Sequence, residues 1–201
     1  MLVLASSSPR RSELLRQWGY KFELVYAPVA ESLTEGVSPQ DAVQALAERK
    51  ALSGYKVWKD NGGSPHDLVL AADTIVVLGE RILGKPNDEN DAYAMLKALS
   101  GQTHQVMTGI ALATEIEERL QIESAVDVTT VTFRKIDDQE ILAYIAGGEP
   151  MDKAAAYAIQ GEGGKFVIGV QGSVTNVIGL PMELLVDKLD QKGVFPVQDS
   201  G

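Results

Sequence analysis

Residues 68–78 have the sequence LVLAADTIVVL, in which Asp73 and Thr74 are the only polar side chains. A run this apolar predicts a strand that is covered on both faces, as in the centre of an α/β sheet. A carboxylate in such a strand is costly to bury unless it is paired, hydrogen-bonded or bound to metal. Asp73 is therefore either part of a functional site or a carboxylate satisfied by backbone N–H groups at a bulge.

A helix is predicted before this strand. Residues 38–41 (SPQD) begin it, with a serine cap and a proline in the first turn. An apolar stripe follows at Val43, Leu46 and Ala47, and Lys50 falls on the same stripe. The Lys50 side chain therefore either extends to solvent along the apolar face or enters a site.

A hairpin is predicted after the strand. Gly79 and Glu80 suit a tight turn that returns residues 81–83 beside it. Lys85 follows the returning segment. We expect it either near Asp73 across the hairpin or in solvent before the next helix.

The rest of the chain mixes helices and strands, which predicts an α/β protein with a mixed twisted sheet flanked by helices. We expect one domain over residues 1–201, in which residues of about 80–145 form a lobe beside a cleft. Further strands are expected at 1–5, 22–26, 105–114, 123–135 and 165–171, an extended piece at 174–178, and a loop at 149–164. Further helices are expected after Ser8 (with Leu14, Leu15 and Trp18 inward), after Asp88, after Asp137 or Asp138 (with Ile141, Leu142 and Ile145 inward), and over 181–192.

Composition excludes several classes of protein. The chain has 201 residues, 45% of them apolar, and a net charge of −10, which disfavours nucleic-acid binding. It has no cysteine, so disulfides, thiolate zinc sites and cysteine nucleophiles are excluded. No apolar run reaches the length of a membrane span, so we expect a cytoplasmic protein without a membrane partner. Two histidines make a histidine triad or metal site improbable, and the motifs of serine hydrolases, P-loop kinases and dinucleotide-binding enzymes are missing.

A second unusual feature is the segment ASSSPRR at residues 5–11. Ser8 and Pro9 suit the start of a helix, but Arg10 and Arg11 follow at the end where acidic residues are favoured. A helix start with two arginines predicts an anion site that suits phosphate; the alternative is a solvated basic turn.

Several polar or charged residues stand where their side chains would be costly to bury, and most of them are cations or carboxylates. This mixture suits metal-assisted cleavage of a phosphoanhydride, in which cations neutralise phosphate oxygens and carboxylates hold the metal and activate water. The residues are Arg10, Arg11, Glu31, Lys50, Asp73, Lys85, Asp152, Lys153 and Gln160.

Several blocks, in order, resemble the Maf proteins, which are nucleotide pyrophosphatases of the inosine triphosphate pyrophosphatase-like structural group. The blocks are ASSSPRR, the Glu31 loop, LAERKA around Lys50, AADTIVVL, GKP at Lys85 and GEPMDKAAAYAIQG. The last block is similar to the subfamily that hydrolyses dTTP and UTP. The resemblance implies a fold of that group and a divalent cation, Mg²⁺ or Mn²⁺.

The resemblance also implies roles by position. Asp73 would activate water and, with Glu31, hold the metal. Arg11, Thr74 and Gln160 match positions tied to substrate choice, and Lys50 and Lys85 match positions that bind metal and phosphates. Arg10 and Lys153 complete the expected substrate-binding set.

Three positions depart from the family pattern. Ala30 stands where an acidic residue precedes Glu31, and Ala155 and Ala158 replace glycines, which would tighten the base pocket. The Gln160 amide offers an acceptor and donors that match the N3–H and O4 edge of uracil or thymine. Without the resemblance, a loop glutamine bonded to backbone is the simpler interpretation.

The sequence thus favours an enzyme that converts dTTP and UTP to the monophosphate and pyrophosphate. One alternative is a nucleotide-binding regulator of cell division and septum formation with little catalysis. Another is a phosphohydrolase that removes modified nucleotides. A homodimer is expected because it is the commonest soluble assembly.

Overall fold

The central strand lies where the sequence predicts it. In the computed structural model, which describes residues 1–197, β3 spans Leu68–Leu78 and its side chains are all buried or half-buried. It pairs in parallel with β1 (Leu2–Ala5), which pairs in parallel with β2 (Glu23–Val25). The short strand β4 (Arg81–Leu83) runs antiparallel to β3, with Val76 opposite Leu83. The predicted hairpin is therefore confirmed.

Three strands from later in the chain complete the sheet: β5 (Thr103–Ile116), β6 (Arg119–Phe133) and β7 (Val167–Gln171). Within residues 1–197 seven strands form one sheet in the order β2-β1-β3-β5-β6-β7, with β4 paired to β3 outside this path. Because β7 is antiparallel to β6 whereas β1 is parallel to its neighbours, the sheet is mixed, as predicted.

Side chains cap helices at three of the starts that the sequence predicts. Ser38 Oγ accepts a hydrogen bond from the backbone N–H of Asp41, and Asp88 and Asp137 accept the equivalent bonds three residues on. The helices are α1 (Pro9–Gln17), α2 (Pro39–Asp60), α3 (Glu89–Leu99), α4 (Asp138–Ala146), α5 (Val174–Ile178) and α6 (Met182–Gln191). The expected loop at 149–164 contains the 3₁₀ helices η1 (Glu149–Asp152), η2 (Ala154–Ala156) and η3 (Glu162–Phe166).

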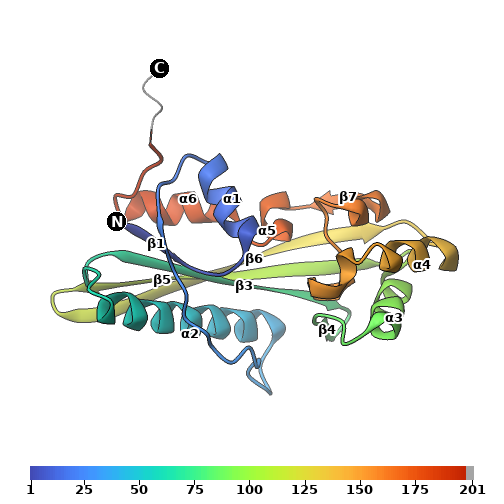
Figure 1. Ribbon diagram of the computed structural model, residues 1–201, viewed down its shortest axis with the longest axis horizontal. Coiled ribbons are helices and arrows are strands. Elements are labelled where there is room, and N and C mark those ends of the chain that lie inside the picture. The colour runs from blue at the N-terminus through green and yellow to red at the C-terminus, as the bar shows by residue number, and fades with distance from the viewer. Residues whose placement is uncertain (198–201) are drawn as a thin grey trace. The chain divides into compact units, whose positions relative to one another are not determined.

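The chain divides into two compact units. The first comprises Met1–Asp73, Thr108–Asp127 and the segment that begins at Gly179; the second comprises Thr74–Met107 and Val128–Ile178. In the first unit, α2 covers one face of the strands, and α1 and α6 cover the other (Figure 1). The four residues that end the expected domain, 198–201, lie outside the described residues. None of the helices within residues 1–197 is both long and apolar enough to span a lipid bilayer.

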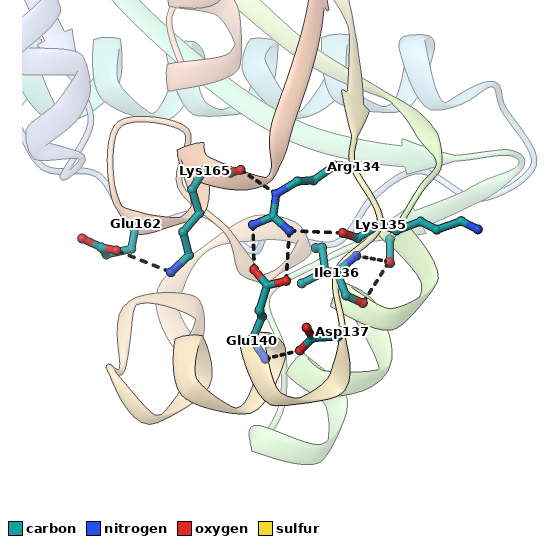
Figure 2. Close-up of polar contacts among 8 residues, drawn as sticks. Arg134, Lys135, Ile136, Asp137, Glu140, Glu162 and Lys165 are labelled. Atoms are coloured by element: carbon teal, nitrogen blue, oxygen red, sulfur yellow. Dashed lines mark hydrogen bonds and ion pairs between the residues drawn. The ribbon is translucent and has the colours of Figure 1, made fainter.

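The second unit has its own core, in which Phe133 and Phe166 are fully buried. Figure 2 shows a polar clamp at its edge. The Arg134 guanidinium makes two hydrogen bonds to Glu140, of 3.0 and 2.6 Å, and its Nε donates to the Lys165 carbonyl at 3.1 Å. This paired, two-bond geometry ties the end of β6 to α4 and to η3.

Three local predictions are wrong. Trp18 is exposed rather than inward, because α1 ends at Gln17 and the chain turns away at Gly19. Leu142 is also exposed, because Ile141, Tyr144 and Ile145 occupy the buried side of α4. Residues 174–178 form a helix instead of an extended piece. The reason is a cap that the sequence analysis did not weigh: Ser173 Oγ accepts from the Asn176 N–H at 3.1 Å.

The connection between β5 and β6 is shorter than predicted: β5 ends at Ile116 and β6 begins at Arg119, so only Glu117 and Glu118 join them. Both residues have positive φ, 50° and 61°, which is the backbone of a two-residue hairpin turn that Asn-Gly normally occupies. The turn was missed because it lacks the residues that usually mark one.

His104 is a buried histidine in the second unit. Its ring nitrogen Nε2 is hydrogen-bonded to the Tyr157 hydroxyl at 2.7 Å, and its ring meets Phe133 edge-on at 5.0 Å between centroids. Among the described residues Nδ1 has no hydrogen-bond partner. Burial lowers the pKa of His104 to about 4, so the imidazole is neutral at pH 7.

The strained turn predicts a stabilising double substitution. Glu117→Asn with Glu118→Gly should raise the free energy of unfolding by about 1 kcal/mol, because left-handed backbone is less costly for Asn and Gly. Thermal denaturation should show a midpoint about 2–4 °C higher. The control, Glu117→Gln with Glu118→Gln, removes the same charges without changing backbone preference and should leave the midpoint unchanged. Equal shifts in both variants would contradict the explanation.

His104 predicts a loss of stability at acidic pH. Because its folded pKa lies below the ordinary value of 6.5, the unfolded chain binds a proton that the folded chain does not as the pH falls below 6.5. This residue should therefore lower the free energy of unfolding by about 2 kcal/mol between pH 7.5 and pH 5. Urea unfolding at both pH values measures the loss. His104→Gln should show a loss smaller by that amount, and an identical loss in both proteins would refute the assignment.

Candidate active site

The site begins with the way α2 packs on the sheet. Val43, Leu46 and Ala47 are fully buried, and Lys50 is the next residue on the same helical stripe. Two glycines permit the close packing. A Cβ on Gly54 would lie 2.4 Å from the Ala5 Cβ, and one on Gly109 would lie 2.7 Å from the Val43 carbonyl oxygen. Lys50 is thereby carried onto the surface of the strands.

The alternation of β3 brings Asp73 to meet it. Val69 and Ala71 belong to the apolar cluster under α2, and Asp73 is the next residue on that face. The Lys50 Nζ lies 2.8 Å from Asp73 Oδ1, and the two side chains are only 16% and 14% exposed. The predicted alternative of a carboxylate satisfied at a backbone bulge is therefore not needed, since a cation pairs with it.

Glu31 supplies a second carboxylate to the same ammonium group. Its Oε1 lies 3.1 Å from Lys50 Nζ, and its side chain is 64% exposed. The Arg49 guanidinium, one residue before Lys50, donates to the carbonyl of Ser32. Helix α2 thus holds the Glu31 loop by two neighbouring cations, and Lys50 bridges a protected and an open carboxylate.

Arg11 joins this charged cluster from the start of α1. Its Nε donates to the Gly179 carbonyl at 2.7 Å, and its Nη1 donates to Ser6 Oγ at 3.4 Å. Burial lowers the pKa of the Arg11 guanidinium; the charge of Asp73 opposes that shift, Arg10 adds to it, and Glu31 opposes it. The group still stays protonated at neutral pH. The Arg11 charge therefore interacts electrostatically with the carboxylates of Asp73 and Glu31.

The start of α1 is built differently from a normal cap. Ser8 occupies the cap position, but within the described residues its side chain makes no capping bond. Its backbone N–H donates instead to Ser6 Oγ at 3.1 Å. No acidic residue lies in the first turn, where Arg10 and Arg11 lie. The anion site predicted at this helix start stays a prediction.

The two carboxylates of this cluster have oxygen donors of the kind that a divalent metal ion prefers. Within residues 1–197 no group of three or more His, Cys, Asp or Glu side chains gathers into a complete metal cage. Glu31 and Asp73 are, however, close enough to share one ammonium group. Mg²⁺ is commonly held by one or two carboxylates together with substrate phosphates, so this donor set suits it.

Apart from Arg10, which lies beside Arg11 in α1, the other predicted residues belong to the second unit. Thr74 is half-buried on β3, and Lys85 is exposed beyond β4. Lys153 is mostly buried and pairs with Asp152, and Gln160 is exposed between η2 and η3. The structure therefore brings Arg11, Glu31, Lys50 and Asp73 together in the first unit, and it places these four residues in the second.

Sequence reasoning missed the groups that orient Arg11 and the Glu31 loop. Gly179 acts through its carbonyl oxygen, 168 residues away from Arg11, and no side-chain pattern reports such a contact. Arg49 was overlooked because it precedes the more conspicuous Lys50. The run of three serines gave the one usable signal, since Ser6 serves both Ser8 and Arg11.

Comparison with known proteins agrees with this arrangement. Residues 1–192 match the family described as Maf-like protein. The chain belongs to the Maf family. A Maf relative from Desulfitobacterium hafniense (strain Y51), named dTTP/UTP pyrophosphatase, is 53% identical over 194 residues, which cover 96% of this chain and 86% of the relative.

Two more relatives carry the same name. The protein of Pelotomaculum thermopropionicum is 44% identical over 192 residues, covering 96% of each chain. The protein of Yersinia pestis bv. Antiqua is 49% identical over 204 aligned positions, covering 99% of this chain and 98% of the relative. The resemblance to Maf proteins drawn from the sequence blocks is therefore confirmed, and the α/β fold with a mixed sheet is consistent with it.

The Lys50–Asp73 pair predicts a measurable coupling energy. A double-mutant cycle with Lys50→Met and Asp73→Asn should give about 1–3 kcal/mol, because Lys50→Met takes the ammonium group away from a mostly buried carboxylate. Urea unfolding at pH 7 provides the four stabilities. The exposed pair Lys97–Asp138, treated in the same way, should give a several-fold smaller coupling because water screens it. Equal couplings in the two cycles would refute this account of the site.

Proposed function

We propose that this Maf protein hydrolyses dTTP and UTP between the α and β phosphates, releasing the monophosphate and pyrophosphate. The observation that carries the proposal is the Lys50 ammonium group, which lies within 3.1 Å of both Glu31 and Asp73. Cations beside carboxylates suit cleavage of a charged anhydride, because the cations can stabilise charge on phosphate oxygens and a carboxylate can accept a proton from water. The names of the relatives support dTTP and UTP as substrates.

Asp73 is the proposed proton acceptor. As a water oxygen forms its bond to the α phosphorus, the carboxylate takes one water proton, and the bond from the α phosphorus to the bridging oxygen breaks. The electron pair of that bond leaves with pyrophosphate. Lys50 and Arg11 stabilise the charge that develops on phosphate oxygens. Glu31 and Asp73 would hold Mg²⁺ or Mn²⁺, which when bound neutralises phosphate charge.

The other residues predicted from the sequence are proposed to supply the remaining contacts. Lys85 and Lys153 are proposed to bind phosphate oxygens, and Arg10 and Thr74 to bind substrate. Gln160, which is exposed, is proposed to select uracil or thymine, because its amide both donates and accepts hydrogen bonds. Cytosine presents the opposite pattern at the same edge and should be rejected. A cytoplasmic location and a homodimer stay predictions from the sequence.

A product assay tests the proposal. The purified protein with Mg²⁺ or Mn²⁺ should convert dTTP and UTP to monophosphate and pyrophosphate, and should act poorly on CTP and dCTP. Chromatography of the nucleotides, with separate detection of phosphate and pyrophosphate, identifies the bond that breaks. A nucleoside diphosphate as first product would refute the proposed reaction. Stoichiometric binding without turnover would favour the regulatory alternative, and preference for modified triphosphates would favour a role in removing them.

Asp73→Asn tests the mechanism. It should lower kcat for dTTP by about 10²–10⁴-fold, the usual contribution of a general base, while circular dichroism shows an unchanged fold. Asp60→Asn is the matched control, because Asp60 is an exposed carboxylate at the end of the helix that carries Lys50. Its kcat should equal that of the unmodified protein. Near-normal turnover by Asp73→Asn would remove this carboxylate from the mechanism.

A further inference from the structure

One carboxylate binds the backbone of the loop that carries Gln160. Glu149, the first residue of η1, accepts a hydrogen bond from the Glu162 N–H on Oε1 and from the Gly163 N–H on Oε2, each at 3.1 Å. The Tyr144 hydroxyl donates to the same Oε2. Three donors thus converge on one half-buried carboxylate, and bonds of this charge-assisted kind are stronger than neutral ones.

Tyr144 extends the same network to the other side of Gln160. Its hydroxyl oxygen accepts from the Ala158 N–H at 3.3 Å while its proton goes to Glu149. The side chain is buried, and burial together with the Glu149 hydrogen bond raises the pKa of Tyr144, so it stays a donor. The backbone is therefore fixed two residues before Gln160 and two residues after it.

The glycines that follow Gln160 are explained by this pair of side chains. A Cβ on Gly161 would lie 1.7 Å from Glu149 Oε1, and a Cβ on Gly163 would lie 2.7 Å from the Tyr144 hydroxyl. Any other residue at these positions would push the carboxylate or the phenol away from the loop. The loop and the Glu149–Tyr144 pair are therefore built to fit each other closely.

The end of the loop is fixed separately. The Arg134 clamp binds the Lys165 carbonyl, so η3 has an anchor of its own (Figure 2). The Glu162 side chain is 80% exposed and pairs with Lys165 at 3.6 Å, so it contributes little to holding the loop. The loss of Glu149 would therefore release the backbone of residues 158–163, while Arg134 would still bind the later part of η3 at Lys165.

We propose that Glu149 is a positioning residue for base selection. Through Tyr144 and the backbone of the loop it fixes where the Gln160 amide presents its donors and acceptor, so it sets the preference for uracil and thymine over cytosine. This inference rests on the proposed function. It adds two residues, Glu149 and Tyr144, to those that determine specificity.

Glu149→Gln is the decisive variant, because it keeps the size of the side chain but replaces one acceptor oxygen with an NH₂ group. The KM for dTTP should rise about 10-fold with kcat within 3-fold, and the ratio of kcat/KM for dTTP over dCTP should fall about 10-fold. Tyr144→Phe should act in the same direction and more weakly. In a Gln160→Ala background, Glu149→Gln should change the ratio no further, because the two residues act as one unit.

Glu162→Gln is the matched control, because it removes an exposed carboxylate from the same loop and should leave KM and the ratio unchanged. Amide hydrogen exchange supplies a test that needs no turnover: Glu149→Gln should speed exchange at Glu162 and Gly163 at least 10-fold, because these two amides donate to Glu149, with α3 and α4 unaffected. Unchanged exchange, or additive effects of Glu149→Gln and Gln160→Ala, would overturn the inference. Failure of the unmodified protein to release pyrophosphate would instead overturn the proposed function, and faster exchange would still support Glu149 as the loop anchor.

Discussion

The first unit depends on the pairing of one ammonium group with one carboxylate beneath a helix. Asp73 interrupts a strand that is otherwise apolar, and its side chain is largely removed from water. A carboxylate in that position destabilises the fold unless a cation accompanies it. Lys50 satisfies this need because it continues the apolar stripe of α2. When α2 packs on the sheet, the Lys50 ammonium group is therefore placed beside the Asp73 carboxylate.

Under the proposed function, the same constraint also prepares the charged cluster to act on a substrate. Lys50 also contacts Glu31, which is mostly exposed, so the cluster joins a protected carboxylate to one that faces solvent. Arg11 adds a positive charge from a different helix, and its orientation is fixed by the Gly179 carbonyl. Groups held in advance by the fold need little reorganisation when charge develops on a substrate, which is how a preorganised site lowers an activation barrier.

The second unit repeats the principle with a different partner. Glu149 is satisfied by two backbone N–H groups and the Tyr144 hydroxyl rather than by a cation. A carboxylate bound in this way organises backbone instead of attracting phosphate. The loop that it holds carries Gln160, so two half-buried carboxylates, Asp73 and Glu149, serve chemistry and selection respectively under the proposed function.

The sequence by itself determined the central strand at 68–78, the capped start of α2, the hairpin after β3, the mixed sheet and the family. These features follow from hydrophobic period, capping residues and short motifs, which are local in the chain. It also singled out Asp73, Lys50 and Glu31 as costly residues. The tertiary structure decided their pairing, the acceptor of Arg11 and the anchor of the Gln160 loop. It also decided that Leu142 faces solvent and that 174–178 is helical. These outcomes depend on backbone groups and packed surfaces brought together from distant segments, and no periodicity in one stretch of chain encodes which distant surface it will meet.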